Sequence, residues 1–441
     1  MKRKIEQRLT EWKRTEGHLP LIIKGIRQCG KTYSVQDFVR KNYRHHLYIN
    51  FLEDKRYASA FGLSLSVDDI LVNLSAIAGN SSELTAGDSC LIFDEIQECP
   101  EARTSLKFFH LDGRYDVIGT GSLLGVSGYG GSPSSVPVGY ETVIDMYPMD
   151  FEEFLWAQDI GDRVIDKIKE CLASQQPIPS AIHERMRQLL LQYTIIGGMP
   201  AVVERFTQSR QPSLALAMQR DLIRSYEDDM IKYAASADKS VIRECFRSIP
   251  KQLSKENKKF QYSVVRKGAT ASRFRGSLQW IEDAGIIRRC YNLNITELPL
   301  AGNAVPDIFK VYMTDTGLFV AMLEDGTQGD IMQGNLTGYK GAIFENLAAD
   351  ILSKQGRNLY YFHKDSGLEV DFVTRLHSQS VLLEVKSTTG NTKSAKTILA
   401  HPEKYGVNHC IKFGDYNVGS TDKVVTVPLY VLPFLEWVKI K

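Results

Sequence analysis

The spacing of hydrophobic and polar positions changes along the chain. In the first 150 residues, short apolar runs such as 21–23 and 90–93 predict strands buried on both faces. Apolar positions three and four apart predict a helix over 32–42. From residue 150 onward helical spacing dominates, at 151–158, 163–174, 182–194 and 214–232. The change predicts an α/β domain over 1–150 and a helical region over 151–238.

Two further patterns follow this helical region. Residues 271–283 predict a helix, Gly285 a stop and the next apolar run a short strand, which together are typical of a winged helix over 239–330. Residues 341–355 then predict an amphipathic helix, and 360–362, 367–373 and 381–386 predict strands of a small α/β domain over 331–441. Alternation in 367–373 buries Val370 and Phe372 and turns Asp371 to the other face.

Residues 25–32 read G-x-x-x-x-G-K-T between a predicted strand and a predicted helix. This is the phosphate-binding loop of nucleotide hydrolases, in which glycines let successive N–H groups point into one concavity. Lys31 can reach the β- and γ-phosphates of ATP, and the Thr32 hydroxyl can ligate Mg²⁺. The residues expected to bind the nucleotide are Gly25, Arg27, Gln28, Cys29, Gly30, Lys31, Thr32 and Tyr33.

Asp94 and Glu95 end the buried run at 90–93. Asp94 is predicted to hold Mg²⁺, and Glu95 to polarise the attacking water in ATP hydrolysis. The alternative is a solvated strand end.

The strand predicted over 115–122 ends in small polar residues, where Ser122 or Thr120 can contact the γ-phosphate or only cap the strand.

A basic cluster lies in the predicted winged helix. Its second helix can enter a DNA major groove, and basic side chains can contact phosphates. Winged helices also serve as protein contacts and spacers, so double-stranded DNA, another protein or a second copy of the chain are all open as partners. The cluster consists of Arg266, Lys267, Arg273 and Arg275.

Acidic residues and a lysine are predicted to meet at one sheet edge near the C-terminus. Asp371 and Glu384 would bind Mg²⁺ in a phosphodiesterase centre, Lys386 would position the attacking water, and Glu345 on the preceding helix would add a ligand. One alternative is a catalytically inactive centre that binds nucleic acid without cutting it. The other is a sheet edge that merely carries charged residues.

Composition narrows the class of protein. The 441 residues carry a formal net charge of +2, which argues neither for nor against a polyanionic partner. The 7 cysteines form no C-x-x-C pair, which argues against a disulfide framework and a structural zinc site. No run of 18 apolar residues predicts a membrane span, and the charged N-terminus does not resemble a signal peptide. We therefore expect a cytoplasmic protein.

Several motifs together carry a family resemblance. The chain resembles bacterial and archaeal P-loop ATPases of the AAA-14/DUF4143 type, which implies an AAA+-like ATPase, a winged helix and a C-terminal domain similar to PD-(D/E)xK nucleases. The implied nucleotide roles fall on Lys31, Thr32, Asp94 and Glu95, with Gln97 and Ser122 nearby, and the implied nuclease-like pattern falls on Glu345, Asp371, Glu384 and Lys386. The matching segments are GIRQCGKT (25–32), LIFDEIQ (91–97), GTGS (119–122), YPMDFEEFL (147–155), GGMP (197–200), LQWIEDAGII (278–287), TDTGL (314–318), FENL (344–347), GLEVDFV (367–373) and LLEVKS (382–387).

No arginine finger is identifiable by motif. Arg103 and Arg114 are the nearest arginines after the Asp94–Glu95 pair.

The leading hypothesis is a Mg²⁺-dependent ATPase whose nucleotide state is coupled to a DNA-binding or nuclease-like C-terminal module. The alternative is an ATP-dependent switch or scaffold, in which an inactive nuclease-like domain binds a protein partner. A P-loop kinase of a small metabolite is a third hypothesis, and it requires neither Glu95 nor a winged helix.

Overall fold

The computed structural model describes residues 1–62, 64–79, 84–122, 139–233, 239–255, 258–335, 339–386, 393–421 and 423–440. The chain divides into two compact units. The N-terminal unit comprises residues 2–148 with 283–285, and the C-terminal unit comprises residues 149–282 and 286–441 with Met1. No helix in the described ranges is both long enough and apolar enough to cross a membrane.

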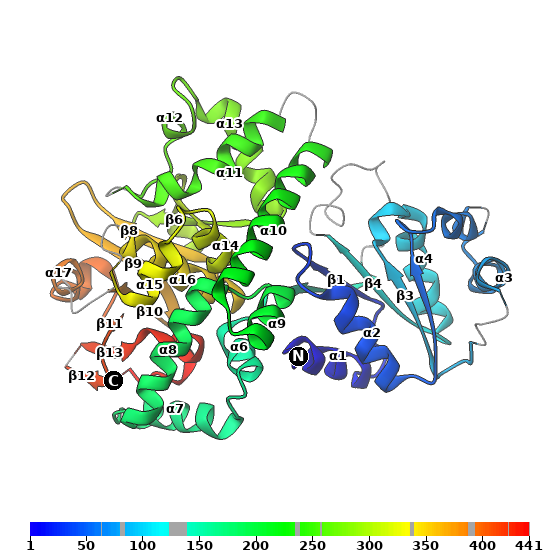
Figure 1. Ribbon diagram of the computed structural model, residues 1–441, viewed down its shortest axis with the longest axis horizontal. Helices are drawn as coiled ribbons and strands as arrows, with labels where there is room; N and C mark the ends of the chain where they lie inside the picture. The colour runs from blue at the N-terminus through cyan, green and yellow to red at the C-terminus, as the bar shows by residue number, and fades with distance from the viewer. Residues whose placement is uncertain are drawn as a thin grey trace. The chain divides into compact units, whose positions relative to one another are not determined.

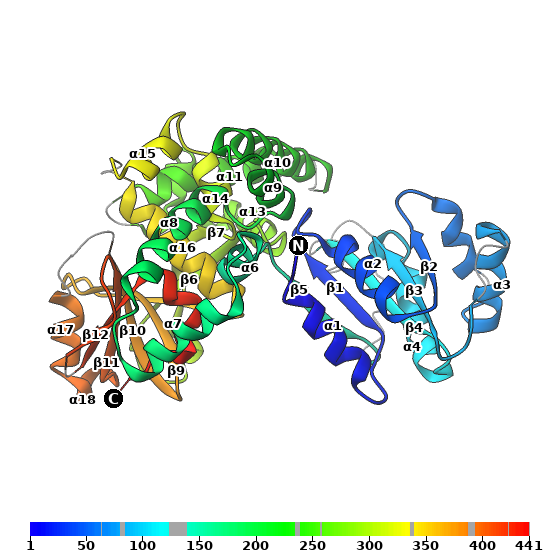
Figure 2. The same cartoon turned by 60° about the horizontal axis from the view of Figure 1, so that its bottom comes forward.

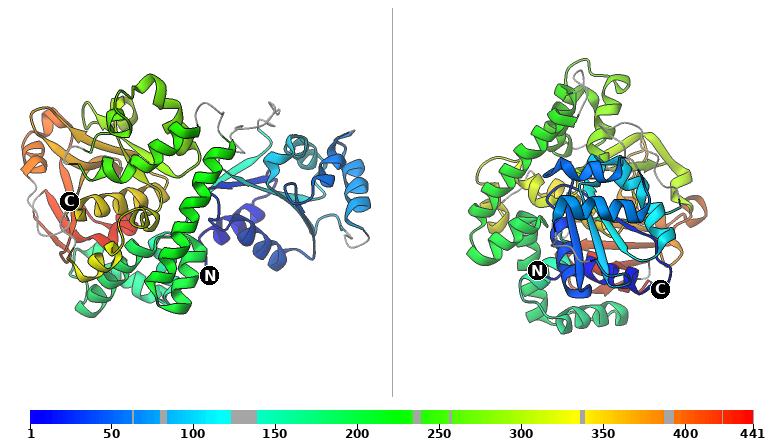
Figure 3. Two further views of the ribbon diagram at one scale, coloured as in Figure 1. Left: turned by 45° about the horizontal axis from the view of Figure 1, so that its top comes forward. Right: turned by 90° about the vertical axis from the view of Figure 1, so that its right-hand side faces the viewer.

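The N-terminal unit is a parallel sheet between helices. Its strands follow the spatial order β2-β3-β4-β1-β5, and every neighbouring pair is parallel. Helices α1 and α2 lie on one face and α3 and α4 on the other (Figures 1 and 3). The strands are β1 (Leu21–Gly25), β2 (His45–Asn50), β3 (Ser89–Asp94), β4 (Asp116–Ser122) and β5 (Thr142–Met146). The helices are α1 (Ile5–Arg14), α2 (Lys31–Asn42), η1 (Lys55–Phe61), α3 (Val67–Ala78), η2 (Ile96–Glu98) and α4 (Pro100–Asp112).

Burial explains why these segments are strands. All six residues of β3 are buried, as the continuous apolar run predicts for a central parallel strand. Its Phe93 packs edge-on against Phe51, Phe61 and Phe109 in the core between the sheet and η1, α3 and α4. The α/β architecture predicted for this region is confirmed.

The C-terminal unit begins with helices that surround its sheet. The first, α6 (Phe151–Ala157), starts in a capping box, since Asp150 and Glu153 each accept a hydrogen bond from the other's backbone N–H. The following helices are α7 (Asp162–Ser174), α8 (Ser180–Ile196), α9 (Pro200–Ser209) and α10 (Pro212–Tyr233). They lie close to the bounds that the apolar spacing predicts.

A mixed sheet of eight strands forms the centre of this unit, in the order β12-β13-β11-β10-β9-β8-β6-β7. Its strands are β6 (Ile287–Leu293), β7 (Ala304–Met313), β8 (Leu359–His363), β9 (Glu369–Leu376), β10 (Gln379–Val385), β11 (His409–Gly414), β12 (Gly419–Ser420) and β13 (Val424–Pro428). The remaining helices are α11 (Lys239–Leu253), α12 (Tyr262–Val265), α13 (Ala271–Asp283), η3 (Leu300–Asn303), α14 (Thr316–Ala321), α15 (Thr327–Gln333), α16 (Lys340–Lys354), α17 (Lys393–Leu399), α18 (Pro402–Tyr405) and η4 (Leu429–Trp437).

The predicted winged-helix and nuclease-like regions share this sheet. Helices α11, α12 and α13 are followed by the antiparallel hairpin β6–β7, as the winged-helix pattern predicts. Strand β6 also pairs in parallel with β8, the first strand after α16, so one sheet runs through both regions. Helices α17 and α18 cover one face of the C-terminal strands and α16 lies on the other (Figure 2). The division of 151–441 into three domains stays a prediction.

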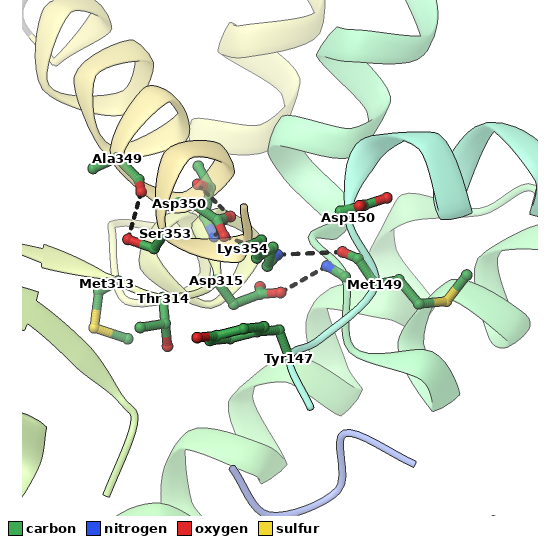
Figure 4. Close-up of polar contacts among 12 residues, drawn as sticks. Tyr147, Met149, Asp150, Met313, Thr314, Asp315, Ala349, Asp350, Ser353 and Lys354 are labelled. Atoms are coloured by element: carbon green, nitrogen blue, oxygen red, sulfur yellow. Dashed lines mark hydrogen bonds and ion pairs between the residues drawn. The ribbon is translucent and has the colours of Figure 1, made fainter. Parts of the chain in front are cut away.

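A buried polar network joins three motifs of the C-terminal unit (Figure 4). The Asp315 carboxylate accepts hydrogen bonds from the backbone N–H groups of Gly198, at 2.6 Å, and Leu318, at 2.9 Å. The Lys354 ammonium lies 2.8 Å from the Asp350 carboxylate and donates to the Met149 carbonyl at 3.2 Å. The segments around 149, 198 and 315 are therefore held together by buried hydrogen bonds, which accounts structurally for YPMDFEEFL, GGMP and TDTGL.

Close packing of two backbone segments explains why residue 198 is a glycine. A Cβ on Gly198 would lie 1.9 Å from the Met149 carbonyl oxygen. The Met149 N–H in turn donates to the Gly198 carbonyl at 2.6 Å. Only glycine allows these two segments to approach so closely.

Candidate functional sites

The phosphate-loop motif connects β1 to α2 in the N-terminal unit. Gly30 has φ 93° and Gln28 has φ 63°, so the loop uses the left-handed region twice before α2 begins at Lys31. A Cβ on Gly25 would lie 2.3 Å from the Met146 carbonyl oxygen on the neighbouring strand β5. The strand–loop–helix context on which the motif depends is therefore present.

The Lys31 side chain folds back over this loop. Its ammonium donates hydrogen bonds to the carbonyl oxygens of Gly25, at 3.0 Å, and Ile26, at 3.1 Å. These contacts hold the ammonium against the loop backbone, and the free N–H groups at the start of a helix such as α2 attract a phosphate as well.

Asp94 at the end of β3 is 3% exposed and is surrounded by uncharged donors. The Thr32 hydroxyl lies 3.0 and 3.1 Å from its two oxygens, and the Tyr48 hydroxyl donates at 2.7 Å. Thr120 and Asn50 also donate to the carboxylate. Carboxylate and hydroxyl oxygens are the ligands that Mg²⁺ prefers, so Thr32 and Asp94 fit that ion.

Glu95 occupies strained backbone. It has φ 51°, a left-handed conformation unusual for a residue with a side chain, and strain of this kind is often stored at functional sites. Its backbone N–H donates to Asp94 at 3.2 Å, and Gln97 donates to its carboxylate. The other side-chain atom of Gln97, Oε1, is buried and has no hydrogen-bond partner in the described ranges.

Sheet register explains how these residues meet. Ser122 on β4 stands opposite Gly25 in the pairing with β1, and Asn50 on β2 stands opposite Asp94 on β3. Ser122 thus lies beside the first loop glycine, as a phosphate-contacting residue requires. Thr120 is instead fully buried against Asp94.

The side chains of the other phosphate-loop residues differ in how far they are exposed. The Cys29 side chain is fully buried and its Sγ faces the Met146 carbonyl at 3.5 Å, so only the backbone of Cys29 is placed to meet a ligand. Tyr33 is 62% exposed. The sequence interpretation missed Arg3, whose guanidinium donates to the Cys29 carbonyl at 3.0 Å and to Tyr147 at 2.8 Å. It also missed Tyr48 and Asn50, because β2 carries no motif.

The two arginines considered as fingers are in ion pairs. Arg103 pairs with Glu141 at 2.7 Å, and both side chains are largely buried. Arg114 pairs with Asp112 at 2.7 Å and with Asp68 at 2.6 Å.

The four predicted residues of the C-terminal centre do come together. The Lys386 ammonium contacts Glu384 and lies 3.5 Å from the Asp371 carboxylate. The Val385 N–H donates to Asp371 at 2.8 Å, which fixes that carboxylate beside β10. Glu345 on α16 contacts Lys258 and Tyr312 instead, and its charge raises the pKa of both Asp371 and Glu384.

Two lysines that the sequence interpretation missed neutralise Glu345. Lys258 contacts one carboxylate oxygen, and the buried Lys310 lies 3.8 Å from the other and 2.9 Å from Glu369. The Tyr312 hydroxyl donates to Glu345 at 3.0 Å. Lys310 stands on β7, and no local motif marks it as part of the centre.

Burial raises the pKa of these three carboxyl groups, whereas the neighbouring lysines lower it. Burial, reinforced by Asp371, raises the pKa of Glu384 to about 7 against the pull of Lys386. Burial and Glu345 likewise raise the pKa of Asp371. Burial alone would raise the pKa of Glu345, but Lys310 and Lys258 outweigh it and hold that pKa below its ordinary value.

The Asp371 and Glu384 carboxylates are the donors a divalent metal prefers, but Lys386 already pairs with both of them. Within the part of the chain that the structure describes, no three His, Cys, Asp or Glu side chains are grouped to hold a metal ion. A metal here would have to displace Lys386.

The basic cluster of the winged-helix region is exposed. Arg266 pairs with Glu244 and Arg275 with Asp307. Lys267 and Arg273 form no ion pair within the described residues. The predicted DNA surface therefore has two cations that no neighbouring acid balances.

These features define an α/β protein with a P-loop nucleotide site. Residues 18–155 match the AAA domain family AAA_14, residues 187–329 match DUF8612, a domain of unknown function, and residues 340–432 match DUF4143, a second domain of unknown function. The chain belongs to the P-loop ATPases of the AAA-14/DUF4143 type. A comparison with curated proteins found no match.

Solved structures show distant similarity. The Walker-type ATPase PABY2304 of Pyrococcus abyssi is 15% identical over 73% of this chain and 95% of its own, with a TM-score of 0.43. The Orc1 protein of Aeropyrum pernix, solved in complex with DNA, is 12% identical over 75% and 91%, with a TM-score of 0.29. DnaA of Aquifex aeolicus, solved with AMPPCP, is 13% identical over 63% and 87%, with a TM-score of 0.26.

Proposed function

We propose that the chain is a Mg²⁺-dependent ATPase whose nucleotide state controls a nucleic-acid-binding, nuclease-like C-terminal unit. The observation that carries the ATPase proposal is the meeting of Lys31, Thr32, Asp94 and Glu95 at the carboxyl ends of β1 and β3. The AAA domain match over residues 18–155 supports the same class.

The proposed hydrolysis assigns one task to each of these residues. Lys31 binds the β- and γ-phosphates, while Thr32 and Asp94 hold Mg²⁺, which when bound neutralises charge on the phosphates. Glu95 orients a water for attack on the γ-phosphorus, so that ADP leaves and phosphate takes up the water oxygen. Ser122, beside Gly25, is placed to contact the γ-phosphate.

The C-terminal half of the proposal rests on Asp371 on β9 with Glu384 and Lys386 on and just after β10, and on Glu345 of α16. Strands β9 and β10 lie inside the mixed sheet, not at the edge that the sequence predicted. Exposed Lys267 and Arg273 offer contacts to DNA phosphates. ATP turnover should rise with double-stranded DNA, and cutting in Mg²⁺ or Mn²⁺ should be lost in Asp371→Ala.

A second candidate is an ATP-dependent switch whose C-terminal unit binds without cutting. The favouring observation is that Lys258, Lys310 and Lys386 already neutralise the acids of the centre. Stimulated turnover with intact DNA would support this version, and turnover indifferent to DNA would point to a protein partner.

Glu95→Gln tests the assigned water-activating residue. The variant should bind ATP normally but lose about 10²–10⁴-fold in turnover, the usual contribution of a general base. Glu98→Gln, an exposed carboxylate three residues away, is the matched control. Normal turnover by Glu95→Gln would show that the base is assigned wrongly.

A further inference from the structure

A pocket of about 330 Å³ lies within the C-terminal unit. Its walls come from α8, α15, the first turn of α16 and the carboxyl ends of β10, β11 and β13 with the residues that follow them. These three strands run parallel to one another, and ligands of α/β proteins commonly bind at the carboxyl ends of parallel strands. The volume is at the lower end of the ~300–1,000 Å³ typical of small-ligand sites.

Lys386 connects this pocket to the acidic centre. It lines the pocket and also contacts the carboxylate of Glu384 and lies 3.5 Å from that of Asp371. A ligand that fills the pocket therefore lies next to the centre proposed to act on nucleic acid.

One cation of the pocket lining has no acidic partner among the described residues. Arg187 is balanced by Glu184, at 3.1 Å, and Asp415, at 2.7 Å. Lys340 also lines the pocket, and its ammonium has no ion pair or hydrogen bond among the described residues. Lys386 is already paired with Glu384 and Asp371, so Lys340 is the lining cation that favours a ligand with a negative charge.

The remaining wall is apolar and includes an accessible ring. Leu190, Ile343 and Leu429 are buried side chains that line the pocket. Phe344, on the same turn of α16 as Lys340, is partly exposed and also faces it. An aromatic ring next to cations suits a ligand in which a flat base is joined to a phosphate, because bases stack on aromatic side chains.

We propose that this pocket binds one nucleoside monophosphate unit, with its phosphate at Lys340 and its base against Phe344. The unit has two sources, a free nucleotide or an unstacked residue of a nucleic-acid strand. The strand source rests on the proposed function, whereas the free-nucleotide source does not.

Binding is measured with the full chain carrying Lys31→Ala, so that the phosphate loop does not compete. One arm uses 2-aminopurine deoxyriboside 5′-monophosphate, and the other an oligonucleotide with a terminal 2-aminopurine. We expect the fluorescence of at least one probe to be quenched on binding, since stacking on Phe344 quenches this base. Lys340→Gln should weaken that binding about tenfold, as loss of a charge-assisted hydrogen bond does.

Phe344→Leu should abolish the quenching. Lys396→Gln and Phe108→Leu remove an exposed lysine and an exposed phenylalanine elsewhere and should leave both binding and quenching unchanged. Thermal melts identify any variant that fails to fold, and Lys340→Gln and Phe344→Leu probe the pocket independently.

Quenching of the mononucleotide supports the free source, and quenching of the oligonucleotide alone supports the strand source. No quenching, or quenching unaffected by Lys340→Gln and Phe344→Leu, overturns the pocket assignment. DNA-stimulated turnover without quenching rejects the pocket and keeps the proposed function. Quenching of the mononucleotide by the Lys31→Ala chain, together with no ATP turnover by the wild-type chain, keeps the pocket and rejects the proposed function.

Discussion

The acids of the two candidate sites are balanced by different kinds of neighbour. Asp94 in the N-terminal unit accepts from the hydroxyl groups of Thr32 and Tyr48 and from no lysine or arginine among the described contacts. Glu345 and Glu384 in the C-terminal unit contact Lys258 and Lys386. Hydroxyl groups leave a carboxylate its full charge, whereas an ammonium cancels it.

This difference bears on what each site can accept. A cation can join Asp94 without breaking an ion pair, because Thr32 can turn from donor to ligand. At Glu384 a cation has to compete with Lys386, and breaking a buried ion pair is costly. The two sites would therefore meet a metal ion differently: the N-terminal carboxylate is free of ion pairs with lysine or arginine among the described contacts, whereas the C-terminal ones already pair with Lys386.

The largest expected effect concerns the nucleotide site of the N-terminal unit. Lys31→Ala should abolish detectable ATP binding and turnover, because it removes the cation held over the loop carbonyls. Lys41→Ala, an exposed lysine at the other end of the same helix, should leave both unchanged. Calorimetric titration with ATP and Mg²⁺ measures the effect, and ordinary affinity in Lys31→Ala would contradict the phosphate-loop assignment.

The next prediction tests whether lysines hold the C-terminal acids. Glu345→Gln should lower the free energy of unfolding by about 3 kcal/mol, because it removes the buried carboxylate that lies between Lys258 and Lys310 and leaves Lys310 with the partly exposed Glu369. Glu369→Gln removes a 42% exposed partner of the same lysine and should cost less than about 1 kcal/mol. Urea unfolding followed by circular dichroism measures both, and equal costs would mean that burial does not distinguish the two partners.

A third prediction uses a buried acid–lysine pair outside both sites as a reference. Burial, with Asp315 adding to it and Lys354 opposing, raises the pKa of Asp350 from 3.8 to about 6. The folded chain therefore holds a proton that the unfolded chain releases between these pH values, so this residue makes stability fall as pH rises through that window. The loss is at most about 3 kcal/mol and persists at higher pH.

Asp350→Asn removes this titration. The free energy of unfolding of the variant, relative to wild type, should improve as pH rises from about 4 to about 7. Asp365→Asn, at an exposed position, should show no such trend. A difference between Asp350→Asn and wild type that stays constant with pH would contradict the shifted pKa.

The smallest expected effect concerns the surface proposed for DNA. Lys267→Gln combined with Arg273→Gln should weaken binding of a DNA duplex a few-fold and reduce its salt dependence, by about one unit of slope per lost phosphate contact. The pair Lys393→Gln and Lys396→Gln on α17 is the matched control. If the two pairs weaken binding equally, the winged-helix face is not the DNA surface.

Local pattern was enough for much of the fold. The run at 90–93 became the fully buried β3, and apolar spacing located α8, α10 and α16 within about two residues at most ends. The motif at 25–32 predicted the strand–loop–helix connection, since its glycines permit left-handed backbone there. The single sheet through β6 and β8 was not predictable, because the paired residues, such as Cys290 and Leu359, are 359 − 290 = 69 positions apart and such pairing leaves no local signal.

What the sequence by itself determined is the chemistry available to this protein: a phosphate loop, an acid after a buried strand, and acids and a lysine on C-terminal strands. These depend on residue type and short-range spacing. What only the tertiary structure decided is which neighbours each acid has. Tyr48 reaches Asp94, and Lys258 and Lys310 reach Glu345, because strands and helices distant in sequence pack together. Charge compensation is a long-range contact, so it appears only once the chain is folded.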